Sequence, residues 1–210
     1  MSDPAELYDA ILVGDAKKAE EVTKAALEAN VDPSELLQKQ MIPAMDEVGK
    51  RFECNEYFVP ELLIAARAMK TALELITPYL AEAGAEPAGR VVIGTVQGDL
   101  HDIGKNLVAS MLEGGGFQVV DLGVDVAPEK FIEAAKEKDG TIVALSALLT
   151  TTMTMMKSVV EGLEKAGIRD QAKVMIGGAP ITQQYADEIG ADGYSDNASA
   201  AVALARSLAG

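Results

Sequence analysis

The sequence predicts an all-α four-helix bundle followed by an α/β domain whose five-stranded parallel sheet is covered on both faces. Residues 1–83 place apolar side chains at helical spacing and contain no convincing strand. Across residues 90–210, short apolar runs alternate with amphipathic segments, which is typical of βα units in a parallel sheet. Residues 84–89 between them are small, include Pro87 and Gly89, and show no periodicity, so we interpret them as a linker.

Four helices with short connections are expected in the N-terminal region, which favours an antiparallel bundle. Asp15 is a candidate N-cap between the first two helices. The third helix should begin near Pro33, and Pro43 within it should kink or split it. The fourth covers about residues 60–80.

In the C-terminal region, right-handed crossovers between parallel strands put helices on both faces of the sheet. We therefore predict a flavodoxin-like strand order, 2-1-3-4-5. A phosphorylated receiver domain would need an aspartate at the end of the third strand, where this chain has Ser146. The strands are expected at 91–95, 118–122, 142–145, 174–176 and 191–194, and the helices near 104–113, 128–138, 151–166, 180–189 and 197–208.

The composition limits the partners and the compartment. The 210 residues carry a formal charge of −15, which argues against nucleic acid and anionic membranes, because these bind clustered Lys and Arg. No apolar run reaches the roughly 18 residues of a membrane span, and the N-terminus has no signal-peptide pattern. Cys54 is the single cysteine, so no intrachain disulfide framework exists and a cytoplasmic protein is expected.

The loop after the first predicted strand, residues 94–106, contains the candidate site, because open α/β sheets bind ligands where strands end. It carries His101, the only histidine, with Asp99 two residues earlier. One interpretation is a structural histidine in a polar turn. The other is a metal ligand whose far nitrogen is held by Asp99. Since one imidazole cannot hold a free metal ion, the remaining ligands would then come from a prosthetic group.

A phosphate-binding loop is excluded at this position. Five residues separate Gly98 from Gly104 where that motif needs four, and Asn106 replaces its Ser or Thr. The aspartates of the loop would also repel a phosphate group.

Three motifs at the ends of predicted strands resemble those of B12-binding domains. In that family the corrinoid binds without its own benzimidazole on cobalt, and a histidine becomes the lower axial ligand. The resemblance therefore implies that His101 binds cobalt and that Asp99 assists it. The motifs are Asp-x-His-x-x-Gly at 99–104, Ser-x-Leu at 146–148 and Gly-Gly at 177–178.

The same resemblance implies contacts with the displaced nucleotide tail of the cofactor. Ser146 would lie near the tail base and is a candidate to support the Asp99–His101 pair, while Leu148 lines the slot and Thr150 contacts the tail. An ordinary helix start capped by Thr150 or Thr151 is the alternative. The full set of expected cofactor contacts in this domain is Gly98, Asp102, Gly104, Ser146, Leu148, Thr150, Gly177, Gly178 and Ala198.

Two of these contacts have simpler explanations. The glycine pair at 177–178 could serve a turn that needs a positive φ, or allow a ligand close to bare backbone. Ala198 lies in an Asn-Ala-Ser stretch similar to one that borders the corrinoid in methionine synthase, but Asn197 could equally be a helix N-cap.

The helical region, from about residue 38, resembles the cap of methionine synthase and of small corrinoid proteins from methanogens and acetogens. The segment from Met45 to Phe52 and the stretch around Val59 carry this resemblance. It implies that Phe52 and Val59, with Met45 nearby, cover the methyl-bearing face of the corrin. Ordinary bundle core is the alternative for each of them.

The resemblance implies a protein that carries a methyl group on the cobalt of cobalamin or a related corrinoid, with methylcobalamin in the cycle. A substrate methyltransferase acting on a methylamine, methanol or an aryl methyl ether would load it. A second methyltransferase, using tetrahydrofolate or coenzyme M, would unload it, and a reductive activator would rescue oxidised cobalt. His101 would bind and leave cobalt during the cycle, and the Asp99–His101 pair would take up a proton.

Other functions share these motifs. A B12-dependent sensor or regulator usually adds a DNA-binding segment and a Trp-bearing cap, and this chain has no Trp. The small subunit of an adenosylcobalamin mutase would lack the methyl-type cap. A B12 store is a third alternative.

Overall fold

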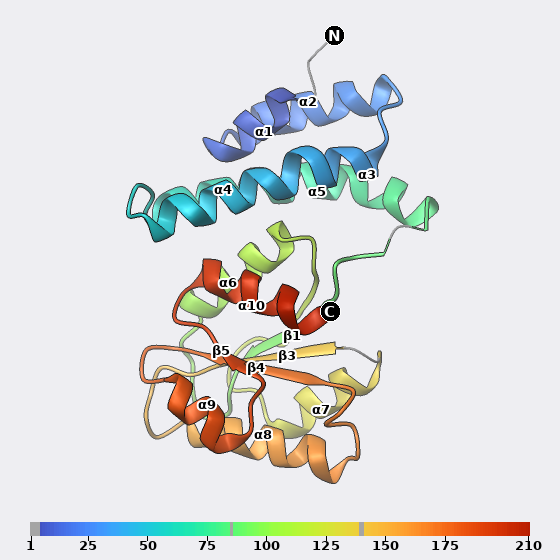
Figure 1. Ribbon diagram of the computed structural model, residues 1–210. Helices are drawn as coiled ribbons and strands as arrows, with labels where there is room; N and C mark the ends of the chain where they lie inside the picture. The colour runs from blue at the N-terminus through green and yellow to red at the C-terminus, as the bar shows by residue number, and fades with distance from the viewer. Residues whose placement is uncertain (1–4, 85, 139–140) are drawn as a thin grey trace. The chain divides into compact units, whose positions relative to one another are not determined.

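The computed structural model describes residues 5–84, 86–138 and 141–210, which divide into two compact units. One unit extends to Pro87 and contains the N-terminal helices, and the other runs from Ala88 to Gly210 without Glu113–Gly116 (Figure 1). The functional division into a cap at 1–83, a linker at 84–89 and a binding domain at 90–210 stays a prediction.

In the described residues up to Pro87, every secondary-structure element of the first unit is a helix, as predicted. Asp15 caps the second helix by accepting a hydrogen bond from the Lys18 amide at 2.9 Å, which confirms the predicted N-cap. Helix α5 packs against α1, α2 and α4, so it forms the centre of this unit. The elements are α1 (Ala5–Leu12), α2 (Ala16–Glu28), α3 (Pro33–Leu36), η1 (Leu37–Met41), α4 (Ile42–Glu53) and α5 (Val59–Glu82).

Pro43 does not interrupt the third predicted helix but changes its winding. It lies in the first turn of α4, directly after the π-helical turn η1. At the end of η1 the Ile42 amide donates to the Leu37 carbonyl, five residues earlier. A proline ring crowds the carbonyl four residues before it, and the wider π turn gives that carbonyl room. The expected kink or split is therefore absorbed as one π turn.

The second unit is a five-stranded parallel sheet in the order β2-β1-β3-β4-β5, which confirms the predicted topology. The register places Thr95 beside Ser146, and Ser146 beside Gly177. The last residues of the three central strands thus adjoin one another at the carboxyl edge of the sheet. The strands are β1 (Arg90–Thr95), β2 (Gln118–Asp121), β3 (Thr141–Ser146), β4 (Lys173–Gly177) and β5 (Gly193–Tyr194).

Helices cover both faces of this sheet, with α6 and α10 on one side and α7, α8 and α9 on the other (Figure 1). Helix α8 begins three residues later than expected, because the chain between β3 and α8 is engaged in the site described below. None of the helices in the described ranges is long and apolar enough to cross a membrane. The helices are α6 (Ile103–Gly114), α7 (Pro128–Lys136), α8 (Thr154–Lys165), α9 (Gln183–Ile189) and α10 (Ala198–Ala209).

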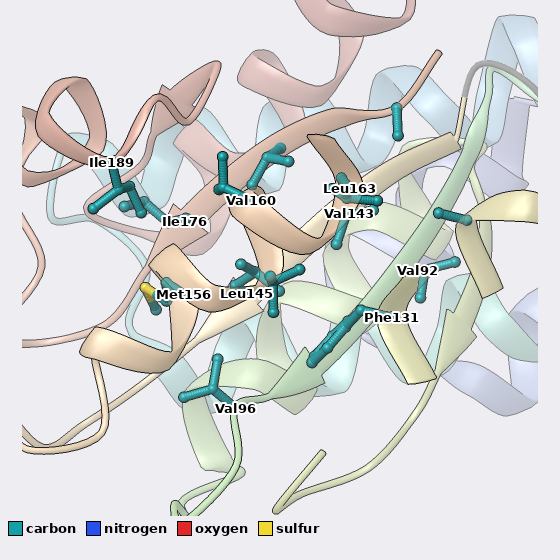
Figure 2. Close-up of a cluster of buried hydrophobic side chains, with 14 of the residues drawn as sticks. Val92, Val96, Phe131, Val143, Leu145, Met156, Val160, Leu163, Ile176 and Ile189 are labelled. Carbon is teal, nitrogen blue, oxygen red and sulfur yellow. The ribbon is translucent and has the colours of Figure 1, made fainter. Parts of the chain in front are cut away.

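A buried apolar cluster joins the sheet to the helices α7 and α8 (Figure 2). Phe131 of α7 and Met156 of α8 are fully buried in it, against Val143 and Leu145 of β3. Burial of side chains of this size contributes about 1.5–3 kcal/mol each. This packing fixes the strand ends, and therefore the starting points of the loops that carry polar groups.

Candidate functional site

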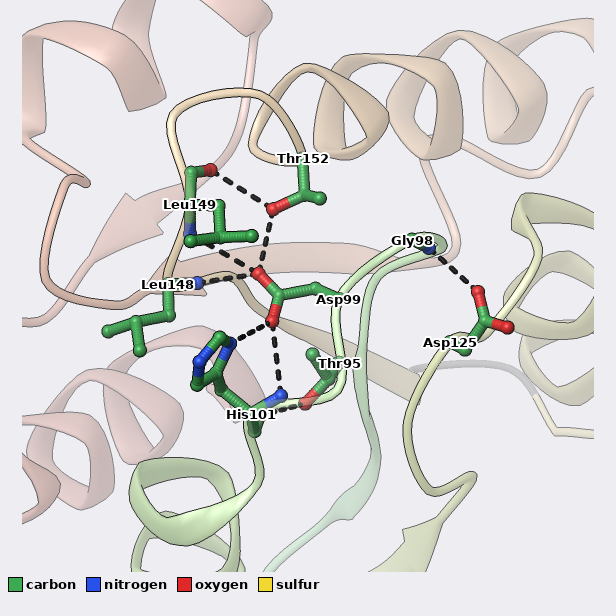
Figure 3. A network of polar contacts seen from close by, with 8 residues as sticks. All are labelled: Thr95, Gly98, Asp99, His101, Asp125, Leu148, Leu149 and Thr152. Atoms are coloured by element: carbon green, nitrogen blue, oxygen red, sulfur yellow. Dashed lines mark hydrogen bonds and ion pairs between the residues drawn. The ribbon is translucent and has the colours of Figure 1, made fainter.

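The candidate site lies where β1 and β3 end, and two loops build it (Figure 3). The first joins β1 to α6 and carries Asp99 and His101. The second joins β3 to α8 and brings Leu148, Leu149 and Thr152 to the same place. The side-by-side register of β1 and β3 explains why these segments meet, although about fifty residues separate them.

Asp99 and His101 form the pair that the sequence predicted. The His101 Nδ1 lies 2.7 Å from Asp99 Oδ1, and the His101 amide donates to the same oxygen at 3.1 Å. Because an ionised carboxylate only accepts hydrogen bonds, Nδ1 carries the ring proton and Nε2 keeps its lone pair. The His101 side chain is 52% exposed, whereas Asp99 is completely buried. Asp99 therefore fixes the ring through Nδ1, and Nε2 is the nitrogen that can bind a ligand.

The other carboxylate oxygen of Asp99 is held by the second loop. It accepts hydrogen bonds from the Leu148 amide at 2.8 Å, the Leu149 amide at 3.3 Å and the Thr152 hydroxyl at 2.7 Å. Burial alone would raise the pKa of Asp99, but the hydrogen bonds from Thr152, Leu148 and His101 outweigh it and hold the pKa well below its usual range.

This charged state of Asp99 has a consequence for stability. Its pKa in the folded chain lies below that of an unfolded aspartate, about 3.9. The carboxylate therefore stabilises the fold at neutral pH, and that contribution is lost as the pH falls below about 4.

Thr152, which the sequence interpretation missed, takes the role that had been considered for Ser146. The hydroxyl that reaches Asp99 belongs to Thr152, while Ser146 is seen accepting a hydrogen bond from the Val96 amide through its backbone carbonyl, at 3.0 Å. The prediction that Ser146 supports the Asp99–His101 pair is therefore wrong for the described structure. A run of three threonines showed that a hydroxyl was available, but local pattern could not tell which one faces Asp99.

The alternative interpretation, a helix start capped by Thr150 or Thr151, is also wrong. The residue before this helix is Met153, and it makes no side-chain capping bond. The amides of Leu148 and Leu149 turn toward Asp99 instead, which delays the helix start. Thr150 itself is exposed, so its contact with a nucleotide tail stays a prediction.

We expect the isosteric variant Thr152→Val to lower the free energy of unfolding by about 1–3 kcal/mol, because a buried charged carboxylate loses a donor. Thr151→Val is the matched control, since Thr151 is exposed next to it. Urea denaturation of both variants measures the difference. Equal stabilities would contradict the contact between Thr152 and Asp99.

Two further side chains form hydrogen bonds with the backbone of the first loop. The buried Thr95 donates its hydroxyl to the His101 carbonyl at 2.8 Å. Gly98, an expected cofactor contact, has φ +83°, and its amide donates to the Asp125 carboxylate at 2.7 Å. The structure therefore assigns Gly98 a role in the turn, and its contact with a cofactor stays a prediction. Asp125, 27 residues from Gly98, carries no sequence signal that links it to this loop.

The start of α6 is fixed by polar contacts that leave no cation for a phosphate. Lys105 is 3% exposed, and its ammonium contacts Asp121 at 2.5 Å and the side-chain oxygen of Asn106 at 2.6 Å. Asp102 accepts from the Asn106 amide through its backbone carbonyl at 2.7 Å. The structure thus agrees with the exclusion of a phosphate loop, and it gives Asp102 a role in the first helical turn.

Exposed apolar side chains accompany the histidine on both loops. Leu100 of the first loop and Ile103, the first residue of α6, are 71% and 83% exposed, and Leu148 and Leu149 of the second loop are each 42% exposed. Gly104 has open space where a side chain would begin. A half-exposed imidazole on a loop with exposed aliphatic side chains fits a large, largely apolar ligand that contains a metal.

Close packing of neighbouring backbone accounts for the glycine pair after β4. Gly178 has φ +134°, and a Cβ there would lie 1.9 Å from the carbonyl oxygen of Ala147. A Cβ on Gly177 would lie 3.2 Å from the Ser195 carbonyl oxygen. The positive-φ explanation is therefore confirmed at Gly178, and ligand contact at either glycine stays a prediction.

The remaining expected contacts lie on α10, α4 and α5. Asn197 caps α10 by accepting from the Ala200 amide at 2.8 Å, as its alternative interpretation predicted, and Ala198 is buried as the first residue of that helix. Met45 and Phe52 lie on α4, and Val59 begins α5. Contact of these residues with a cofactor stays a prediction.

Comparison with known proteins relates both parts of the chain to one function. A family model described as a B12 binding domain matches residues 89–203, and a second model of the same description matches residues 5–77. Trimethylamine corrinoid protein 1 of Methanosarcina acetivorans is 48% identical over 206 residues, which cover 97% of this chain and 95% of that protein.

Two solved structures are similar over nearly the whole chain. A cobalamin-binding protein from Desulfitobacterium hafniense has a TM-score of 0.80 and 34% identity, with 100% of both chains covered. A chain in the methanol:cobalamin methyltransferase complex of Methanosarcina barkeri has a TM-score of 0.85 and 31% identity, with 97% of this chain and 78% of that chain covered.

Proposed function

Because the chain belongs to the B12-binding domain family, we propose that it carries a methyl group on the cobalt of a bound corrinoid between two methyltransferases. The observation that carries this proposal is the His101 ring, whose Nδ1 is fixed by Asp99 at 2.7 Å and whose side chain is 52% exposed. When bound, the corrinoid supplies a cobalt centre that can accept a methyl group and pass it on.

In this proposal His101 would bind the cobalt through Nε2. Asp99 sets the tautomer and the orientation of the ring and makes it a better donor. Leu100 and Ile103 would contact apolar parts of the corrinoid, and Leu148 would line the slot for the nucleotide tail. When His101 does not bind the metal, its Nε2 can hold a proton whose charge is balanced by Asp99.

The relatives support methyltransferases as the partners. Proteins named trimethylamine and dimethylamine corrinoid proteins in Methanosarcina acetivorans are 48% and 44% identical to this chain. We therefore propose that a methylamine methyltransferase loads this protein. A second methyltransferase that uses tetrahydrofolate or coenzyme M unloads it, and a reductive activator restores oxidised cobalt. A cytoplasmic location stays a prediction from the single cysteine.

The test is reconstitution of the full chain with a corrinoid, followed by chemical reduction and addition of methylamine methyltransferases with tri-, di- or monomethylamine. We expect the visible spectrum to change to that of the methylated cofactor with one of these pairs. Free corrinoid under the same conditions is the control for methylation without the carrier. Corrinoid binding without methylation by any pair, the methanol enzyme included, would contradict the proposal and favour a sensor or a store.

A further inference from the structure

Asp125, in the loop between β2 and α7, makes two hydrogen bonds with the loop that carries His101. Its carboxylate accepts from the Gly98 amide at 2.7 Å. Its own amide donates to the Asp99 carbonyl at 3.0 Å. The first bond, drawn in Figure 3, holds the peptide group before Gly98, and the second holds the peptide group after Asp99. Residues 98 and 99 are therefore held at both ends.

The backbone of Asp125 adopts the conformation that these two bonds require. Its φ is +54°, in the left-handed region that is unusual for residues other than glycine and that aspartate and asparagine tolerate best. A neighbouring pairing of Val96 with Val126 brings the two loops into the same register. The side chain and the backbone of Asp125 thus act together on residues 98 and 99.

We propose that Asp125 is a positioning residue for the Asp99–His101 pair. The direction of the Asp99 side chain depends on the backbone of residues 98 and 99, and Asp125 bonds that backbone from both ends. The second loop contacts Asp99 at its carboxylate, and the Thr95 hydroxyl contacts the His101 carbonyl. Within the first loop, the Asp99 amide also donates to the Val96 carbonyl at 3.1 Å, so Asp125 supplies the bonds to residues 98 and 99 that come from the loop after β2. Asp125 therefore controls how well the His101 ring is aimed at a ligand, without touching the ligand itself.

This inference is tested by two readouts, of which only the second rests on the proposed function. Two variants separate the side-chain role of Asp125 from its backbone role. Asp125→Asn keeps a side-chain acceptor for the Gly98 amide and tolerates a positive φ. Asp125→Gly tolerates the same backbone but has no acceptor. The difference between them isolates the oxygen that holds Gly98, and urea denaturation verifies that both variants fold.

The first readout uses the chain without cofactor. His101 is the only histidine, so its ring signals in a proton–nitrogen NMR correlation need no assignment. At alkaline pH we expect wild type and Asp125→Asn to show one tautomer with the proton on Nδ1. Asp125→Gly should show a mixture of tautomers. The same single tautomer in all three folded proteins would overturn the proposal.

The second readout is the fraction of histidine-bound cobalt in the loaded chain, measured from the visible spectrum at one fixed pH. We expect the ratio of bound to unbound histidine to fall about fivefold in Asp125→Gly, as for the loss of one modest hydrogen bond, and to be retained in Asp125→Asn. A loss of equal size in both variants would overturn the proposal, because the asparagine keeps the acceptor. If wild type shows no histidine-bound cobalt, the proposed function fails, and the NMR comparison still decides the role of Asp125.

Discussion

His101→Ala is expected to abolish nitrogen coordination of the bound cobalt while the chain still folds and still binds corrinoid. His101 is the only histidine, so no other imidazole can replace it. Its side chain is 52% exposed, which keeps the cost to the fold small. Removal of a group that only supports a metal ligand typically costs about 10–100-fold in metal affinity, and removal of the ligand itself should cost at least as much in corrinoid affinity.

Two spectra measure this result. The visible spectrum of the loaded variant should change to that of cobalt without a nitrogen ligand below the ring. The electron spin resonance spectrum of the Co(II) form should lose the splitting caused by a coordinated nitrogen. Turnover with the methylating partner should fall as well, because the bound and unbound states of the ligand are no longer available.

Rescue by added imidazole is the matched control for this prediction. In His101→Gly the space of the ring is free, and a soluble imidazole can occupy it next to Asp99. We expect added imidazole to restore nitrogen coordination in that variant. A visible spectrum of His101→Ala identical to that of wild type would show that His101 does not bind cobalt.

The fold could be predicted from the sequence because each element carries its own periodicity. Helical spacing in the first 83 residues and alternating βα runs after residue 90 are local signals, and the strand order follows from the handedness of crossovers. Pro43 shows the limit of such signals. It breaks a simple helical pattern, but one π turn before it lets the helical path continue.

The site could be predicted only where its parts are close in sequence. Asp99 and His101 are two residues apart, so their pairing is visible in the printed chain. Thr152 bonds Asp99 from 53 residues away in the sequence, and Asp125 bonds Gly98 from 27 residues away. Only the register of the sheet brings these residues together. For the same reason the supporting hydroxyl was expected at Ser146, inside the recognised motif, and lies at Thr152 beyond it.

Gly178→Ala is expected to lower the free energy of unfolding by about 3 kcal/mol or more, because it combines backbone strain with a clash. The ideal Cβ would lie 1.9 Å from the Ala147 carbonyl oxygen, at φ +134°, so backbone atoms would have to move. Ala147 is the first residue of the loop whose amides hold Asp99, so the strain reaches the site. Urea denaturation measures the loss, and wild-type stability would contradict the close packing of these two loops.

Gly104→Ala is the matched comparison, because it tests a glycine that the fold itself does not need. In the described part of the chain, no atom lies within 4 Å of a Cβ at Gly104 apart from its own helix and chain neighbours, and alanine favours the helix by up to about 1 kcal/mol. We therefore expect unchanged or higher stability together with weaker corrinoid binding, measured by titration of the chain with cofactor. Unchanged binding would show that the macrocycle does not approach the first turn of α6. Both glycines belong to recognised motifs, but one is required by a neighbouring loop and the other, in this proposal, by the ligand.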